Sequence, residues 1–228
     1  MLLNLFRGGL TVQSAIAQIL AVLVIIFLIL PLHEWAHAQT AYLLGDKDIK
    51  QRGRLSLNPL SHIDPVGALF MLLVGFGWAK PVPIDPRNFK NPRVGMAVTA
   101  VMGPVSNLVA AFVGMIVFYA LWAFAPDFMY SQFGNYVIIF LQFYITVNVN
   151  LAVFNLIPIP PLDGSKVLFT FLPDSAVNFF YRYQRLFAGL LFLLIYLGPL
   201  STMLSFFTTN IVNGMSWLAK LPFSAFVS

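Results

Sequence analysis

Long runs of apolar residues alternate with short polar connections along this chain. Four runs have the roughly 20 residues that a membrane-spanning helix needs, at positions 12–32, 95–125, 136–157 and 187–207. The first run is followed by a sequence compatible with helix, so we expect that helix to continue to residue 44. The pattern predicts an all-α, polytopic membrane protein with four transmembrane helices.

Two shorter apolar segments fall outside this set. Residues 69–78 are too few to cross a bilayer, and we expect them to form a re-entrant or β-hairpin element. Residues 211–226 are interrupted by Gly214 and Pro222 and are expected at the membrane interface. Since no long Gly/Ser-rich, Pro-rich or charged linker divides the chain, we expect residues 1–228 to form a single membrane-embedded domain.

Composition and charge agree with a membrane protein. The chain is 59% hydrophobic and 9% charged, far from the quarter of charged residues in a typical soluble domain. Eleven of its 13 lysines and arginines lie in the connections after the first and third apolar runs. This placement indicates topology and not a nucleic-acid partner. The positive-inside rule puts both connections on the cytoplasmic side, in the cell (plasma) membrane, with both termini on the other face.

The end of the first apolar run carries a metal-binding pattern, His33-Glu34-Trp-Ala-His37. Histidines four residues apart lie on one face of a helix, so both imidazoles can reach one zinc ion. Glu34 is then near enough to hold the attacking water, take its proton and pass it to the leaving amine. Ionisable groups at membrane depth are costly and usually functional. Two hydrogen-bonded structural histidines are the alternative interpretation.

A catalytic zinc ion needs a third protein ligand and an open position. The chain has no cysteine and no glutamate besides Glu34, which leaves His62 or an aspartate. The main candidates are His62, Asp64 and Asp163. Asp163 follows an apolar stretch broken by three prolines, and broken backbone at membrane depth is tolerated where it lines a cavity. We favour Asp163, with His62 as the next choice.

These motifs carry a family resemblance. A helix ending in His33-Glu34-Trp-Ala-His37, followed about 125 residues later by Asn155-Leu-Ile-Pro-Ile-Pro-Pro-Leu-Asp163-Gly, resembles the site-2 protease family of intramembrane zinc proteases. Segments 61–67 and 77–83 resemble those of its short members, which lack a PDZ domain. The resemblance implies one zinc ion per chain, held by His33, His37 and Asp163. It also implies that Glu34 is the acid/base and that Asn155 helps to hold the substrate or intermediate.

Several other residues are candidates for a supporting role. Lys80, Pro81, Val82 and Pro83 belong to a segment kept extended by its prolines, which is expected to bind an unwound substrate by strand addition. An ordinary proline-rich loop is the alternative. Asn107 and His62 are candidates to contact and orient the metal ligands. Alternatively, Asn107 simply forms a hydrogen bond to a neighbouring helix, and His62 is a loop histidine capped by Asp64.

The sequence therefore predicts a zinc endopeptidase acting on a transmembrane protein substrate within the lipid bilayer, by regulated intramembrane proteolysis. Two other functions are compatible with a zinc site. A non-proteolytic zinc-binding regulator would not require Glu34, and a zinc transporter would require ligands repeated along a path across the bilayer. Only one ligand cluster is visible in the sequence.

Overall fold

The first predicted helix is present and leads directly into the candidate site. The computed structural model describes residues 12–74 and 77–226. Helix α2 (Val12–Val24) passes through a short π-helical segment, η1 (Ile25–Ile29), into α3 (Leu30–Leu44). The helix ends at Gly45, whose φ of 127° is rarely adopted by residues with a side chain. The prediction of one continuous helix to residue 44 is confirmed.

The connection after α3 is irregular and contains four short helices: α4 (Asp48–Gln51), η2 (Pro59–Ser61), α5 (Pro65–Val74) and η3 (Pro86–Asn88). Ile63 and Ala79 form an isolated antiparallel bridge, so the chain folds back between them. No strand forms within the described residues. Neither the predicted re-entrant path of residues 69–78 nor a full β-hairpin is confirmed, and residues 75–76 lie outside the described part of the chain.

The second and third predicted membrane helices are confirmed as α6 (Pro92–Phe124) and α8 (Gln132–Asn155), joined through the short α7 (Pro126–Tyr130). Each long helix begins at a side-chain cap. Asn91 Oδ1 accepts a hydrogen bond from Val94 N, and Ser131 Oγ accepts one from Gly134 N, which satisfies backbone donors that a helix start leaves free.

The fourth predicted span is wrong as a continuous helix. Helix α11 (Gln184–Leu197) and α12 (Pro199–Lys220) are bent by 78° relative to each other. The break falls at Gly198, with a φ of 103°, followed by Pro199, which cannot donate the backbone hydrogen bond needed to continue a helix. Helix α12 then runs through Gly214, so residues 211–220 form no separate segment. Helices α9 (Asp163–Phe169) and α10 (Asp174–Arg182) precede α11, and η4 (Leu221–Phe223) follows α12.

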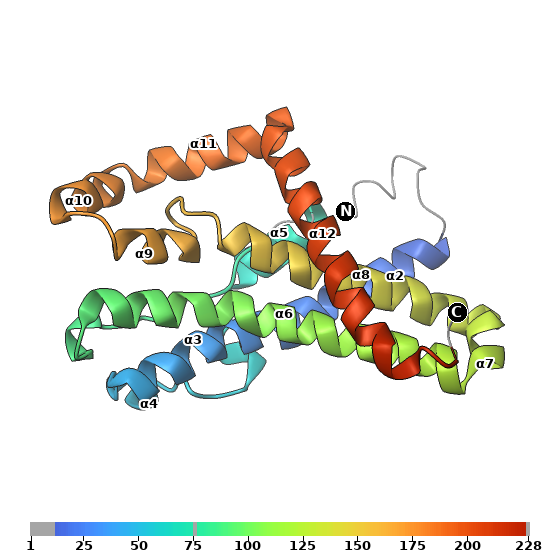
Figure 1. Ribbon diagram of the computed structural model, residues 1–228. Coiled ribbons are helices and arrows are strands. Elements are labelled where there is room, and N and C mark those ends of the chain that lie inside the picture. The colour runs from blue at the N-terminus through green and yellow to red at the C-terminus, as the bar shows by residue number, and fades with distance from the viewer. Residues whose placement is uncertain (1–11, 75–76, 227–228) are drawn as a thin grey trace.

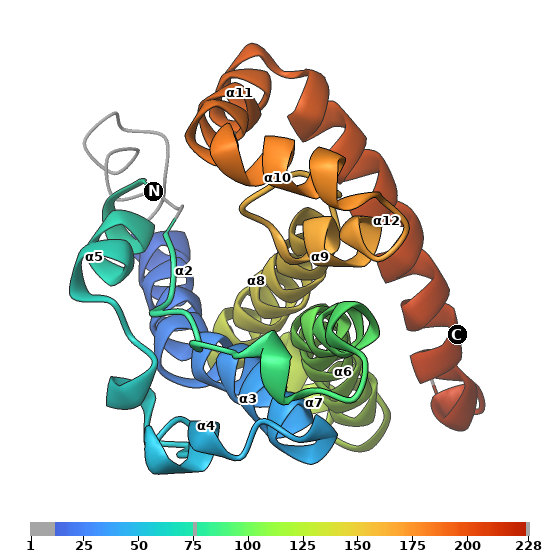
Figure 2. The same cartoon turned by 90° about the vertical axis from the view of Figure 1, so that its left-hand side faces the viewer.

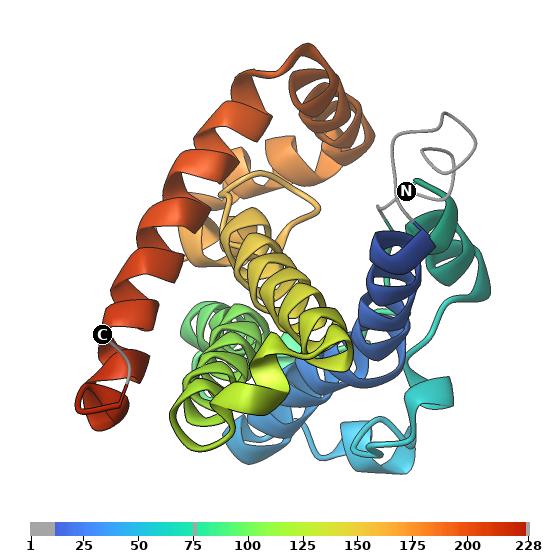
Figure 3. The ribbon, with the colours of Figure 1, turned by 90° about the vertical axis from the view of Figure 1, so that its right-hand side faces the viewer.

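Three long helical units form the centre of the molecule (Figure 1). Helices α2–α3, α6 and α8 pack together, and α2 and α12 lie on opposite flanks of the α6–α8 pair (Figures 2 and 3). Small residues allow close approach: a Cβ on Gly114 would lie 3.0 Å from the ring of Tyr144. One buried apolar cluster contains Val22, Ile25, Ile26, Ile29, Met71 and Ala110, and partly buried residues of α8, among them Tyr144 and Val147, pack against it.

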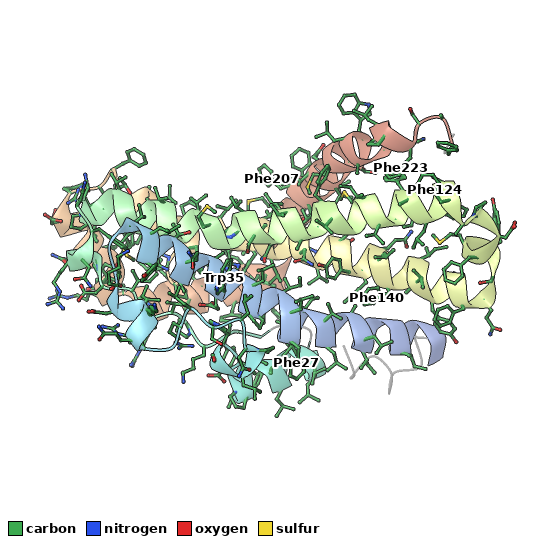
Figure 4. All side chains as sticks on the ribbon, turned by 90° about the horizontal axis from the view of Figure 1, so that it is seen from below. Phe27, Trp35, Phe124, Phe140, Phe207 and Phe223 are labelled. Atoms are coloured by element: carbon green, nitrogen blue, oxygen red, sulfur yellow. The ribbon has the colours of Figure 1, made fainter. Side chains whose placement is uncertain are left out.

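The outer surface is that of a multi-pass membrane protein. Within the described residues, three helices are long and apolar enough to span a bilayer, or four if the bent α11–α12 pair counts as one span. Phe27, Phe124 and Phe207 are exposed along the flanks, whereas nitrogen and oxygen atoms gather at the end where α3 finishes and α6 begins (Figure 4). Exposed rings on the flanks fit a lipid environment, and this polar end fits contact with water.

Candidate metal centre

Helix α3 presents two histidines to the same point. His33 and His37 are one helical turn apart, and both are buried. Their Nε2 atoms are 3.0 Å apart, and the two rings meet at an interplanar angle of 87°. The i, i+4 spacing therefore brings together the two nitrogen atoms that a single metal ion could share.

Asp163 is far from the two histidines in sequence but close to them in space. Helix α8 ends at Asn155, and residues 156–162 form turns through Pro158, Pro160 and Pro161 before α9 begins at Asp163. The carboxylate Oδ2 lies 3.3 Å from His33 Nε2 and 3.2 Å from His37 Nε2. These three residues are all buried, and their ligand atoms all lie within 4.8 Å of one another, so they could hold one metal ion.

Neighbouring groups orient two of the three side chains. His37 Nδ1 lies 2.7 Å from the carbonyl oxygen of Thr99 in α6; as donor, it leaves Nε2 directed at Asp163. Lys166 Nζ donates a hydrogen bond of 3.0 Å to Asp163 Oδ1, the oxygen that does not face the histidines.

Gly103 of α6 packs directly against the candidate ligands. A Cβ at this position would lie 2.3 Å from His37 Nε2 and 2.6 Å from His33 Cε1. Any side chain here would collide with both imidazoles. Two imidazole nitrogens and one carboxylate oxygen match the three protein ligands of a catalytic zinc site.

Glu34 lies between this centre and the extended segment 79–84. It follows His33 in α3, and its Oε2 accepts a hydrogen bond of 3.1 Å from the backbone N–H of Val82. The segment predicted to bind substrate therefore contacts the residue predicted to act as acid/base.

The two edges of segment 79–84 differ. Arg54 donates to the carbonyl oxygens of Ser61 and Pro81, and Arg52 donates to that of Pro83. The N–H groups of Lys80 and Val82 are bound instead by the His62 carbonyl and by Glu34. In extended backbone, groups of alternate residues point to opposite edges. The arginines therefore hold one edge, and the other edge faces Glu34.

The structure does not bring His62 to the metal centre. His62 is fully buried, its Nε2 lies 2.7 Å from the Ser56 carbonyl, and its own carbonyl binds Lys80 N–H. Asp64 likewise accepts hydrogen bonds from Val66 N and Gly67 N and begins α5. His62 thus stabilises the connection that carries segment 79–84.

The two predicted asparagines make no hydrogen bond to the candidate ligands among the described residues. Asn155 ends α8 and donates from Nδ2 to Leu151 O in its own helix. Asn107 lies one turn beyond Gly103 in α6, is 1% exposed, and neither amide atom has a hydrogen-bond partner in the described part of the chain. The roles of Asn155 and Asn107 remain predictions.

Sequence reasoning missed four contributors to this site: the Thr99 carbonyl, Gly103, Lys166 and the Arg52–Arg54 pair. Only Lys166 had a readable signal, because its position three residues after Asp163 places both on one face of a helix. The other contributions depend on which segments the fold brings together.

Comparison with known proteins agrees with this centre. The family model described as peptidase family M50 matches residues 21–196. The chain belongs to peptidase family M50, the site-2 protease family. No PDZ domain is evident in the described residues, which contain no strand. This M50 chain is 37% identical over 171 residues to "Putative zinc metalloprotease YwhC" of Bacillus subtilis, covering 75% of this chain and 77% of that one.

More distant relatives carry a similar name. "Putative zinc metalloprotease Rip2" of Mycolicibacterium smegmatis is 33% identical over 142 residues, and the Rip2 protein of Mycobacterium tuberculosis is 30% identical over the same length. These matches cover 60% of this M50 chain and 51% of each relative. No solved structure matches the chain. The family and the names of these relatives indicate zinc as the metal, and His33, His37 and Asp163 are a group that could hold one such ion.

Proposed function

We propose that this M50 chain is an HExxH-type zinc endopeptidase that cleaves a peptide bond in or near the transmembrane segment of a membrane-protein substrate. The observation that carries the proposal is the position of Glu34, whose neighbour His33 belongs to the metal centre and whose carboxylate contacts Val82 N–H. One residue thus links the ligands to an extended segment suited to bind another extended chain.

Substrate binding would take place along the Glu34 edge of segment 79–84. A transmembrane helix hides its carbonyl groups in internal hydrogen bonds, so it must unwind before cleavage. Val82 carries the donor that a substrate can take on this edge, because Lys80 N–H already binds the His62 carbonyl and Pro81 and Pro83 have no N–H. A substrate strand that pairs with Val82 takes its N–H from Glu34 and frees that carboxylate oxygen.

Chemistry would then divide among a few side chains. Zinc held by His33, His37 and Asp163 supplies Lewis-acid polarisation of the scissile carbonyl and a lower pKa for the attacking water. Glu34 accepts the proton of that water and delivers it to the leaving amine. Asn155, at the end of α8, is assigned to steady the oxygen of the tetrahedral intermediate.

The proposed location is the cytoplasmic side of the plasma membrane, with residues 1–228 acting as one membrane-embedded domain. Support comes from the basic residues between α3 and α6, because they lie in the connection that follows the helix carrying His33 and His37. Release of a fragment from this side would make the reaction a step of regulated intramembrane proteolysis.

Glu34→Gln tests the proposal. The variant, reconstituted in vesicles with a transmembrane peptide, should retain one zinc ion per chain and lose cleavage by about 10²–10⁴-fold, the contribution of general acid–base catalysis. Chelation should abolish wild-type cleavage. Normal cleavage by Glu34→Gln would refute the mechanism, and no product from the zinc-loaded wild type would favour a regulator or transporter.

A further inference from the structure

A small cavity lies beside the metal centre, where the start of α6 meets α9 and α10. Its volume is about 190 Å³, and its lining includes Pro86, Met96, Lys166, Phe169, Val177 and Tyr181. Sites for whole small-molecule ligands usually enclose about 300–1,000 Å³. This cavity therefore has the size for a single side chain.

Three elements connect the cavity to the proposed catalytic residues. Met96 lies three residues before Thr99, whose carbonyl binds His37, and Lys166 lies three residues after Asp163. Three residues of α-helix span about 4.5 Å, so two helices place the cavity about one turn from the ligands. The third element is Pro86, which follows segment 79–84 and lines the same cavity. A chain paired along segment 79–84 therefore runs toward this cavity.

The lining selects an apolar occupant. Both nearby cations already have carboxylate partners: Lys166 binds Asp163, and Arg93 binds Asp174 at 2.6 Å. Arg93 also donates to the Leu172 carbonyl. Apart from these pairs, Thr170 and Tyr181, the lining is apolar and includes Phe169, Val177 and Met96. An acidic substrate residue would find no unpaired cation here, whereas a large apolar side chain would bury its surface.

We infer that this cavity is a specificity pocket for a large apolar side chain of the substrate, such as Leu, Met or Phe. This inference rests on the proposed function. Residues 82 and 86 are four apart, which in extended backbone is about 13 Å. The selected side chain therefore lies within about four residues of the scissile bond.

Val177 is the position at which to alter the pocket, because it lines the cavity from α10 and is not one of the proposed ligands. Val177→Trp should fill the cavity. Asn178→Trp, on the next and exposed residue of α10, adds the same side chain outside it. The substrates are transmembrane peptides in vesicles that carry Phe or Ala at each position within four residues of the cleavage site.

At one position the wild type should cleave the Phe peptide about 10-fold faster than the Ala peptide, in kcat/KM, the usual scale for a pocket that recognises a few methylene groups. Val177→Trp should reduce this ratio to near one, and Asn178→Trp should retain it. An unchanged Phe-to-Ala ratio of kcat/KM in Val177→Trp, or an equal loss of that ratio in Asn178→Trp, would overturn the assignment of this cavity as a specificity pocket.

A second measurement separates this inference from the proposed function. Peptides carrying a photoreactive leucine analogue at each position are bound to zinc-loaded Glu34→Gln and irradiated. One position should crosslink to Phe169, Val177 or Tyr181. Wild-type cleavage without such a crosslink would overturn the pocket alone. A crosslink without wild-type cleavage would support the pocket as a peptide site and overturn the endopeptidase.

Discussion

The two sides of Glu34 are built in different ways. On one side, His33, His37 and Asp163 are buried side chains fixed by contacts between α3, α6 and α9. On the other side, segment 79–84 is held through its backbone, by two arginines, the His62 carbonyl and Glu34 itself. Packed helices resist displacement, whereas hydrogen bonds at a half-exposed connection can exchange partners. The metal centre is therefore expected to keep a fixed geometry, and segment 79–84 is expected to adjust when a substrate binds.

The largest effect is expected from Gly103→Ala, which acts on the fixed side. The added Cβ would lie 2.3 Å from His37 Nε2, and displacing a site by about 1 Å typically costs 10²-fold in activity. We expect loss of zinc and at least this loss of cleavage. Gly189→Ala in α11 is the control, because nothing lies within 4 Å of its added Cβ. Metal analysis showing full zinc content in Gly103→Ala would contradict the assignment.

A smaller effect on the same side is expected from Lys166→Met. Loss of the hydrogen bond to Asp163 Oδ1 should weaken zinc binding about 10–100-fold, the usual result of removing a group that orients a metal ligand. Competition with a zinc chelator measures this affinity. Lys166→Arg should restore most of it. Lys90→Met, on an exposed residue before α6, should bind zinc as the wild type does; equal weakening there would show a general charge effect.

On the segment side, Arg54→Gln should raise KM about 10-fold and leave zinc content unchanged. The buried guanidinium joins the Ser61 and Pro81 carbonyls, and leaving such acceptors without a donor costs about 1–3 kcal/mol. Arg52→Gln should have a smaller effect, because Arg52 is exposed and its guanidinium binds only Pro83 among the described residues. Loss of zinc from Arg54→Gln would show that the two sides are not independent.

The smallest effect concerns pH at the end of the same segment. Arg87 donates hydrogen bonds to Asp85 and lowers its pKa from 3.8 to about 2. Because the folded pKa lies below the ordinary value, the contact stabilises the turn above about pH 4 and is lost as pH falls toward 2. Hydrogen exchange of residues 85–88 should quicken over that range. Asp85→Asn should exchange faster already at neutral pH; identical exchange in both would exclude the contact.

The sequence was sufficient to predict the three residues that the structure brings together as a candidate metal centre, because chemistry restricts the possible ligands. One glutamate, three histidines and no cysteine leave few ways to hold zinc, and Asp163 was identified among them from the proline-broken stretch before it. The long helices α3, α6 and α8 were also predictable, since their apolar runs are long enough to span a bilayer, and α6 continues as helix through Pro104.

The remaining features depend on tertiary contacts. The Thr99 carbonyl could belong to any residue type, so no sequence pattern marks it. Arg52 and Arg54 were interpreted as topological charges, and their contacts with Pro81 and Pro83 depend on a connection of irregular path. The break at Gly198–Pro199 carried a readable signal, but the high apolar content of residues 187–207 favoured a single span.

Pro81 and Pro83 have a consequence for self-association. An unpaired strand edge normally invites pairing with any other chain, including copies of itself. On the edge held by Arg52 and Arg54, the proline nitrogens carry no hydrogen and the carbonyls are already bound. Segment 79–84 can therefore pair with one added strand on its Glu34 edge, but it cannot pair with a second strand on the edge held by Arg52 and Arg54. It can accept a partner chain without seeding the growth of a larger sheet.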